Sequence, residues 1–124
     1  MAPVDKPTVL VADDRELTEI LLEQYCGCRV LEAEDGAEAV EVARSERPDL
    51  ILMDLRMPGL DGYEAAARIR EDPALQSVPM IAYTAYYSFS ITNGALEAGF
   101  DEYTRKPMTA EEMSELVGCY LKAR

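Results

Sequence analysis

The chain has 124 residues, of which 48% are hydrophobic and 29% charged, a balance typical of one globular domain rather than a disordered or fibrous protein. Its 24 acidic and 12 basic residues give a net charge of −12, which disfavours a nucleic acid or a membrane surface as partner because like charges repel. No apolar run reaches the roughly 20 residues of a membrane-spanning helix, and Met1–Lys6 lacks the pattern of a signal peptide.

The sequence contains no histidine and three cysteines. The lack of histidine excludes Ser-His-Asp and Cys-His catalysis and leaves transition metals without their commonest ligand. Three cysteines are too few, and odd in number, for a disulfide framework, so we expect a reducing, cytoplasmic compartment. We also expect residues 1–7 to be a disordered leader and residues 8–124 to form a single domain.

Five segments have the character of β-strands. In chain order they are Thr8–Ala12, Arg29–Ala33, Leu50–Met53, Pro79–Tyr83 and Asp101–Arg105. The first, third and fourth are apolar throughout, which is the pattern of strands that are buried on both faces. The second and the fifth are weaker candidates.

Helical patterns lie between these segments and after the last. The first helix is indicated by the helical spacing of Leu17, Ile20 and Leu21, and the fourth is expected over Ser90–Ala98. The second, third and fifth begin with a residue pair: Asp35 with Glu38, Asp61 with Glu64, and Thr109 with Glu112. The fifth continues with an apolar stripe of Met113, Leu116, Val117, Tyr120 and Leu121. In each pair an oxygen-bearing side chain precedes glutamate by three residues, which indicates the start of a helix. Because Thr92, Asn93 and Gly94 are weak helix formers, we expect Ser90–Ala98 to be short or mobile. We expect Cys119 to pack beside the final stripe.

This alternation predicts an α/β fold in which a parallel sheet carries helices on both faces. In such sheets ligands bind beyond the carboxyl ends of the strands. The residues at these ends are Asp13 and Asp14 after the first strand, Asp54 after the third, Thr84 after the fourth and Lys106 after the fifth. If the first and third strands are neighbours, three carboxylates converge in one cleft.

Three clustered carboxylates need a counter-charge, which a hard cation such as Mg2+ supplies. Lys106 adds a positive charge that suits a phosphoryl group, and Thr84 adds a hydroxyl. These residue types indicate transfer of a phosphoryl group onto Asp54, which needs no general base because a carboxylate is already deprotonated. Each residue alone also fits an ordinary role, such as a helix cap or a solvated loop charge. Their common position at four strand ends favours the functional interpretation.

The motifs that carry these residues resemble the receiver domain of two-component response regulators, over Val9–Leu121. They are Asp13-Asp14 after VLVA, the segment Asp54–Gly62 (DLRMPGLDG), Thr84-Ala85, the segment Tyr103–Pro107 (YTRKP) and the segment Glu97–Asp101 (EAGFD). The resemblance implies a flavodoxin-like, doubly wound (βα)5 fold with a five-stranded parallel sheet in the order 2-1-3-4-5.

The resemblance also implies a role for each position. Asp54 would accept a phosphoryl group from a histidine kinase or a histidine phosphotransferase. The ligands of Mg2+, or of Mn2+ in its place, would be Asp14 directly, Asp13 mainly through water, Asp54, and the main-chain carbonyl of Arg56. Lys106, Arg56 and Ala85 would contact the phosphoryl group, Thr84 would move toward it as the switch, and Tyr103 would rotate inward. Such a protein is no enzyme for a separate substrate, since it catalyses only its own phosphorylation and dephosphorylation.

The same resemblance implies that the switch alters the surface of the fourth helix, fifth strand and fifth helix, which would bind a downstream protein or a second copy of the chain. The sequence ends at Arg124, directly after the last helix, so we expect the output to lie in another protein. Tyr86, Tyr87 and Phe89 stand where the family has more polar residues. Inward packing and an exposed docking patch are equally good interpretations of these aromatic residues.

Two other functions compete with a signalling switch. An aspartate-nucleophile phosphatase also attacks phosphate with a carboxylate after a parallel strand. Its motif resembles D-x-D, however, and Arg56 occupies the position of the second aspartate, which protonates the leaving group. The other alternative is a receiver-like module that binds partners without phosphorylation. All five chemical positions are present, which argues against it: Asp13, Asp14, Asp54, Thr84 and Lys106.

Overall fold

The computed structural model describes residues 7–12, 29–56, 59–84, 89–105 and 109–122. Within them, five strands form one parallel sheet in the order β2-β1-β3-β4-β5. The strands are β1 (Thr8–Ala12), β2 (Arg29–Ala33), β3 (Leu50–Asp54), β4 (Met80–Thr84) and β5 (Glu102–Arg105). The parallel sheet, its order and all five strands are confirmed, and each strand ends within one residue of its predicted bounds.

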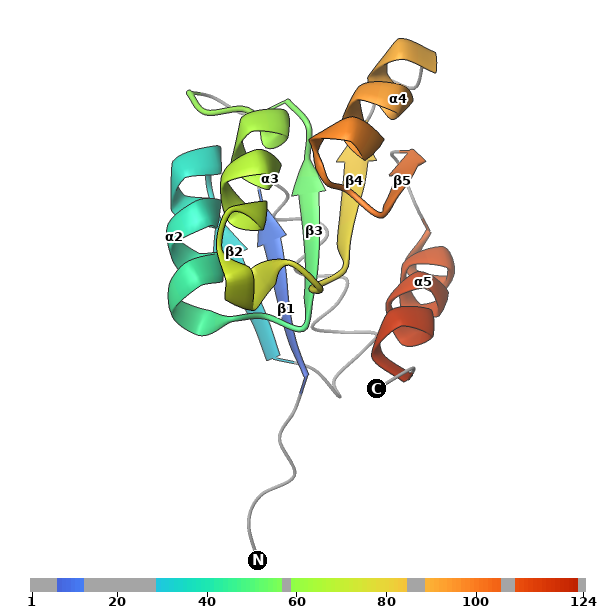
Figure 1. Ribbon diagram of the computed structural model, residues 1–124. Helices are drawn as coiled ribbons and strands as arrows, with labels where there is room; N and C mark the ends of the chain where they lie inside the picture. The colour runs from blue at the N-terminus through green and yellow to red at the C-terminus, as the bar shows by residue number, and fades with distance from the viewer. Residues whose placement is uncertain (1–6, 13–28, 57–58, 85–88, 106–108, 123–124) are drawn as a thin grey trace, which may run out of the picture.

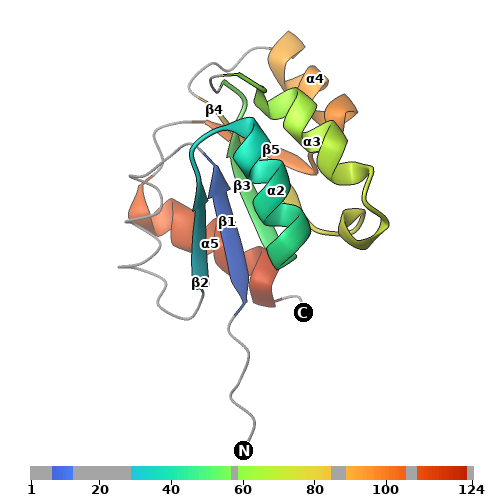
Figure 2. The same cartoon turned by 90° about the vertical axis from the view of Figure 1, so that its left-hand side faces the viewer.

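Helices cover both faces of the sheet (Figures 1 and 2). Those on one face are α2 (Gly36–Glu46), α3 (Gly62–Arg70) and α4 (Phe89–Ala98), and α5 (Ala110–Lys122) lies on the other. The short 3-10 turn η1 (Pro73–Leu75) connects α3 to β4. The helix predicted around Leu17 lies outside the described residues. Among the helices that the structure describes, none is long and apolar enough to cross a membrane.

Alternate residues of the central strands build two hydrophobic layers. On β3, Ile51 and Met53 face the layer of α2, α3 and α4, whereas Leu50 and Leu52 face α5. All five residues of β3 are buried, which explains why the sequence of this strand is apolar without alternation. Burial of both layers is the main favourable term that holds the helices on the sheet.

The three predicted helix starts are confirmed. The side chains of Asp35 and Asp61 accept hydrogen bonds from the backbone N–H of Glu38 and Glu64, at 2.8 and 3.0 Å. At α5 the bond is reciprocal, because Glu112 N–H donates to Thr109 Oγ1 and Thr109 N–H donates to Glu112 Oε1, each at 3.0 Å. The hydrogen bonds from Thr109 lower the pKa of the Glu112 carboxyl below its usual value. Each cap satisfies N–H groups that a helix start leaves without an internal partner.

Two expectations about the helices are wrong: that the fourth helix is short, and that Cys119 is packed. The other half of the first expectation, that this helix is mobile, stays a prediction. The fourth helix is not short, because α4 has 10 residues and α3 has 9. Packing of α4 on α3, where Gly94 faces the ring of Tyr63, outweighs the weak helix propensity. Cys119 is exposed rather than packed, because it lies two positions after the buried Val117 and therefore on the opposite side of α5.

Arg70, the last residue of α3, joins four segments at the amino-terminal edge of the sheet. Its Nε donates to the carbonyl of Gly99 at 3.0 Å, and its Nη1 donates to the carbonyls of Leu75 and Val78, each at 2.7 Å. Its Nη2 pairs with Asp101 Oδ2 at 2.9 Å. The rigid fork of guanidinium donors suits several acceptors at once. Arg70 thus ties α3 to η1, to the end of α4 and to the start of β5.

The connection from β3 to α3 is held by two close backbone contacts. Gly62 N–H donates to the carbonyl of Leu55 at 3.1 Å, and a Cβ on Gly62 would lie 2.4 Å from the carbonyl oxygen of Asp54. At the other end of this connection, a Cβ on Gly36 of α2 would lie 1.9 Å from the carbonyl oxygen of Leu60. Only glycine fits such a close approach to backbone, so the connection is held between α2 and the end of β3.

The Arg70 contacts predict a large loss of stability on truncation. Arg70→Ala should lower the free energy of unfolding by about 2–4 kcal/mol, because three carbonyls and a carboxylate lose their donor. The matched control is Arg68→Ala, which removes an exposed side chain whose ion pair with Glu64 spans 3.9 Å, and it should cost at most about 1 kcal/mol. Urea unfolding followed by circular dichroism measures both. Equal losses would contradict the role assigned to Arg70.

The close approach at Gly62 predicts that a single methyl group is costly there. Gly62→Ala should lower the free energy of unfolding by about 1–3 kcal/mol, because the new Cβ forces the backbone of Asp54 aside. Gly94→Ala is the control, since it meets only a movable ring and gains up to about 1 kcal/mol of helix propensity. Thermal unfolding of the two variants compares them. A Gly62→Ala protein as stable as Gly94→Ala would show that the backbone contact is not tight.

Candidate functional site

Asp54 is the last residue of β3 and lies at the carboxyl edge of the sheet, at the strand that is central in its order. Its exposure is 8%, and it is the one charged residue that is buried among those described. Its Oδ1 accepts a hydrogen bond from the backbone N–H of Arg56 at 3.0 Å. Burial of a carboxylate is costly unless hydrogen bonds or charges compensate for it. The position of Asp54 therefore points to a function rather than to a surface charge.

The neighbouring strand ends meet at the same edge. Asp54 lies in register with Tyr83 on β4, so Thr84 is one residue farther along the adjacent strand. Thr84 is in turn in register with Arg105 on β5. On the other side of β3, Ala12 of β1 is in register with Met53. The chain thus leaves β1, β3, β4 and β5 at one rim, as the sequence predicted.

Tyr103 lies two residues before the end of β5, in register with Ala82 of β4. Its side chain is half-buried and packs against the layer beneath α2, α3 and α4. Arg56 is exposed directly beyond Asp54, and its main chain contacts the Asp54 carboxylate. Of the predicted site, the structure therefore describes Asp54, Arg56, Tyr103 and the backbone of Thr84.

The other predicted site residues are not described. Asp13, Asp14, Ala85 and Lys106 lie outside the described residues, and of Thr84 the structure describes the backbone alone. Tyr86 and Tyr87 also lie outside, as does the side chain of Phe89, so neither interpretation of these aromatic residues is tested.

The residues that hold the connection after Asp54 were assigned no role from the sequence. Gly62 belongs to the quoted segment Asp54–Gly62, and Gly36 follows the cap residue Asp35. The sequence does contain one sign of their role: each is a glycine at the first position of a helix, where glycine is less favourable than other residues. Gly59 has a positive φ of 71°, which glycine adopts without strain. These glycines allow the backbone conformation of the connection that follows Asp54 and Arg56.

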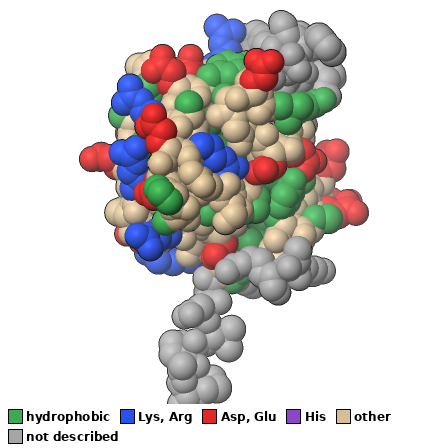
Figure 3. Space-filling model, viewed as in Figure 1, with side chains coloured by type: hydrophobic (Ala, Val, Ile, Leu, Met, Phe, Trp, Pro, Cys, Tyr) green, Lys and Arg blue, Asp and Glu red, His purple; other side chains and the backbone are tan. Residues whose placement is uncertain are grey.

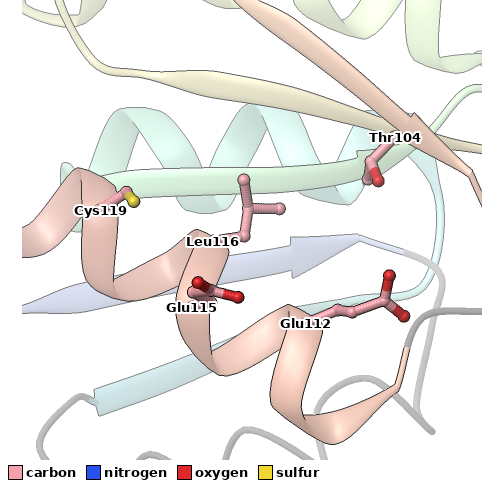
Figure 4. Close-up of a pocket in the computed structure, with 5 residues that line it drawn as sticks. All are labelled: Thr104, Glu112, Glu115, Leu116 and Cys119. Carbon is pink, nitrogen blue, oxygen red and sulfur yellow. The ribbon is translucent and has the colours of Figure 1, made fainter.

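A pocket of about 330 Å³ lies between β5 and α5. It is lined by Thr104, Glu112, Glu115, Leu116 and Cys119. Figure 4 shows four of these side chains on successive turns of α5 and Thr104 on β5. Figure 3 shows acidic and hydrophobic side chains on the side of the molecule where β5 and α5 lie, and basic side chains mixed with acidic ones over α2 and α3. The charge of the described surface is thus unevenly distributed.

Comparison with known proteins places these features in a family. The family model described as the response regulator receiver domain matches residues 9–118. An uncharacterised 14.6 kDa protein of Leptolyngbya boryana is 37% identical over 119 residues, covering 93% of this chain and 90% of that protein. The polar-differentiation response regulator DivK of Brucella anthropi is 32% identical over 117 residues, covering 92% of this chain and 95% of DivK.

A solved structure supports the same assignment. The receiver domain of the sensor histidine kinase PA1611 from Pseudomonas aeruginosa superimposes with a TM-score of 0.84 at 32% identity, covering 96% of this chain and 99% of that one. That structure has a magnesium ion coordinated in its active site cleft. The parallel sheet, the buried aspartate at the end of β3 and these similarities agree, and the chain belongs to the family of response regulator receiver domains.

Proposed function

We propose that the chain is a phosphorylatable switch of a two-component or phosphorelay system, in which Asp54 accepts the phosphoryl group. The observation that carries the proposal is the buried Asp54 carboxylate at the carboxyl end of β3, 8% exposed and bonded by the N–H of Arg56. This is the edge at which parallel α/β sheets bind ligands. A receiver domain whose buried charge lies there is suited to phosphoryl transfer.

The transfer is a substitution at phosphorus. A carboxylate oxygen of Asp54 forms the new O–P bond while the P–N bond of a donor phosphohistidine breaks, and the released imidazole takes up a proton. The hydrogen bond from Arg56 to Oδ1 orients the carboxylate toward the incoming group. The contact between Gly62 and the Asp54 carbonyl holds the backbone of the nucleophile in place. Dephosphorylation by water returns Asp54 to the carboxylate.

The donor set at this edge fits a hard divalent cation. The Asp54 carboxylate and the Arg56 main-chain carbonyl are oxygen donors on adjoining backbone, and such ligands suit Mg2+ and Mn2+. We assign Asp14 as a further direct ligand and Asp13 as a ligand mainly through water. When bound, Mg2+ neutralises the charge that the carboxylates and the phosphoryl oxygens bring together. The magnesium ion in the PA1611 receiver domain supports this assignment.

The remaining residues of the motif would connect the acyl phosphate to the surface. Lys106 pairs with the phosphoryl group, Ala85 leaves room beside it, and Thr84 donates its hydroxyl. Tyr103 then turns inward beside Thr84. The half-buried position of Tyr103 against the layer that includes α4 supports this route. The phosphorylated state is favoured because only that state makes these contacts.

The partners follow from this chemistry. A histidine kinase or a histidine phosphotransferase donates the phosphoryl group, and the surface of α4, β5 and α5 binds a downstream protein or a second copy of the chain. The pocket between β5 and α5 lies within that surface. A phosphatase function is disfavoured because Arg56 is exposed where that mechanism needs an acid. A module that works without phosphorylation would not need a carboxylate buried at this edge.

The first test is covalent modification at Asp54. Wild-type protein mixed with acetyl phosphate and Mg2+ should gain the mass of one phosphoryl group, and Asp54→Asn should gain none, by intact-mass spectrometry. The control is Asp72→Asn, which changes an exposed turn at the opposite edge, where Asp72 caps η1. It should be modified like the wild type. Modification of Asp54→Asn would refute the acceptor assignment.

The second test is metal binding. Asp14→Asn should weaken Mg2+ binding by at least about tenfold, because a direct carboxylate ligand is lost. Glu41→Gln removes the same charge from the exposed side of α2 and should leave the affinity within about twofold, since distant surface charges are screened. Isothermal titration calorimetry in the absence of any phosphoryl donor measures both. An unchanged titration for Asp14→Asn would remove that residue from the ligand set.

A further inference from the structure

The first residue of α2, Gly36, lies against the backbone of the connection from β3 to α3. A Cβ on Gly36 would lie 1.9 Å from the carbonyl oxygen of Leu60 and 2.8 Å from its carbonyl carbon. Gly36 is buried, and only a residue without a side chain fits at such distances. The helices that begin on either side of this contact, α2 and α3, pack side by side on one face of the sheet (Figure 2). The start of α2 therefore forms a backbone wall for the connection.

From Leu60, two residues of backbone lead back to the end of β3. Gly62 N–H donates to the carbonyl of Leu55 at 3.1 Å, and a Cβ on Gly62 would lie 2.4 Å from the carbonyl oxygen of Asp54. Segment 60–62 is thus in contact with α2 on one side and with the Asp54 backbone on the other. Closely packed backbone transmits a displacement instead of absorbing it. A shift at Leu60 therefore reaches Asp54.

The start of α2 is the more firmly held side of this contact. Asp35 accepts two hydrogen bonds, at Oδ1 from Glu38 N–H at 2.8 Å and at its carbonyl from Ala39 N–H at 3.0 Å. Glu38 Oε1 accepts another from Glu34 N–H at 2.6 Å, and Ala39 is fully buried. The Leu60 side chain, in contrast, is only half-buried. A group added at Gly36 therefore displaces the connection rather than the helix.

The Asp54 carboxylate is sensitive to such a displacement. Its Oδ1 accepts a hydrogen bond from Arg56 N–H at 3.0 Å, and the strength of this bond depends on the distance and angle that the backbone sets. Groups that orient a metal ligand change the affinity for the metal even though they do not touch it. The backbone contact at Gly36 therefore bears on how the carboxylate is presented to a cation.

We propose that Gly36 is a positioning residue for the Asp54 carboxylate. Its bare Cα lets the Leu60 carbonyl lie against α2, and the connection then holds Asp54 in the orientation that binds the cation. This inference rests on the proposed function and adds to it a residue that follows β2, two strands away from β3 in the sheet order. Gly36 acts through Leu60 and Gly62 and takes no part in the transfer itself.

Two measurements on Gly36→Ala test the positioning role. In metal-free protein, the amide proton resonance of Arg56 should move upfield in NMR spectra, because its hydrogen bond to Asp54 lengthens. By isothermal titration calorimetry, Mg2+ binding should weaken by at least about tenfold. The control is Gly99→Ala, the same change at a glycine with a φ of 119°, where a Cβ would lie 2.8 Å from Cγ of Arg70. It strains the opposite edge of the sheet and should leave the Arg56 resonance in place and the Mg2+ affinity within about twofold.

A second pair of variants tests the same contact from the other side, and decides the question if Gly36→Ala does not fold. Leu60→Ala removes the half-buried side chain that packs the connection against the hydrophobic layer. It should shift the Arg56 resonance and weaken Mg2+ binding by at least about fivefold. Leu31→Ala truncates another half-buried leucine of that layer, on β2, and should keep the affinity within about twofold.

The outcomes separate this inference from the proposed function. Wild-type protein that binds no Mg2+ would contradict the proposed function, and the inference would fail with it. If wild type binds Mg2+ while folded Gly36→Ala or Leu60→Ala keeps both its affinity and its Arg56 resonance, the positioning role is wrong and the proposed function stands. An equal loss of affinity in Gly99→Ala or Leu31→Ala would show a general effect of lower stability, which also refutes the role.

Discussion

A carboxylate buried at the end of a fully buried strand is the constraint on which this structure depends. β3 is covered on both faces, and Asp54 ends it with 8% exposure. A charge in that position is costly unless nearby groups compensate for it. The backbone of Arg56 provides one such contact at 3.0 Å. The hydrophobic layers that stabilise the sheet therefore also create the conditions in which a cation and a phosphoryl group are favourable neighbours.

The two edges of the sheet, at the carboxyl and amino-terminal ends of the strands, carry different groups. At the carboxyl edge, Asp54 lies beside the end of β4, where the backbone of Thr84 is in register with Arg105 of β5. At the amino-terminal edge, Arg70 and Asp101 bind four segments to one another.

Much of the fold was predictable because it follows from local patterns. Apolar runs predicted the central strands, and the pairs that begin with Asp35, Asp61 and Thr109 predicted three helix starts. Contacts between distant residues were not predictable: Gly62 against the Asp54 carbonyl, and Arg70 against α4 and β5, leave no periodic trace in the sequence. The length of α4 was misjudged for the same reason, since its packing on Tyr63 outweighs propensity. At the site, the sequence predicted the position of Asp54 but not how completely it is buried.

The most direct test of the account is chemical location of the acyl phosphate. Protein treated with acetyl phosphate and Mg2+ is reduced with borohydride, which converts an aspartyl phosphate to homoserine, and tandem mass spectrometry of the peptides then locates the converted residue. Homoserine is expected at position 54 alone. Homoserine at Asp61, the residue that caps α3 at the end of the same connection, or at no position despite a gain in mass, would contradict the claim that the buried carboxylate at the end of β3 is the reactive group.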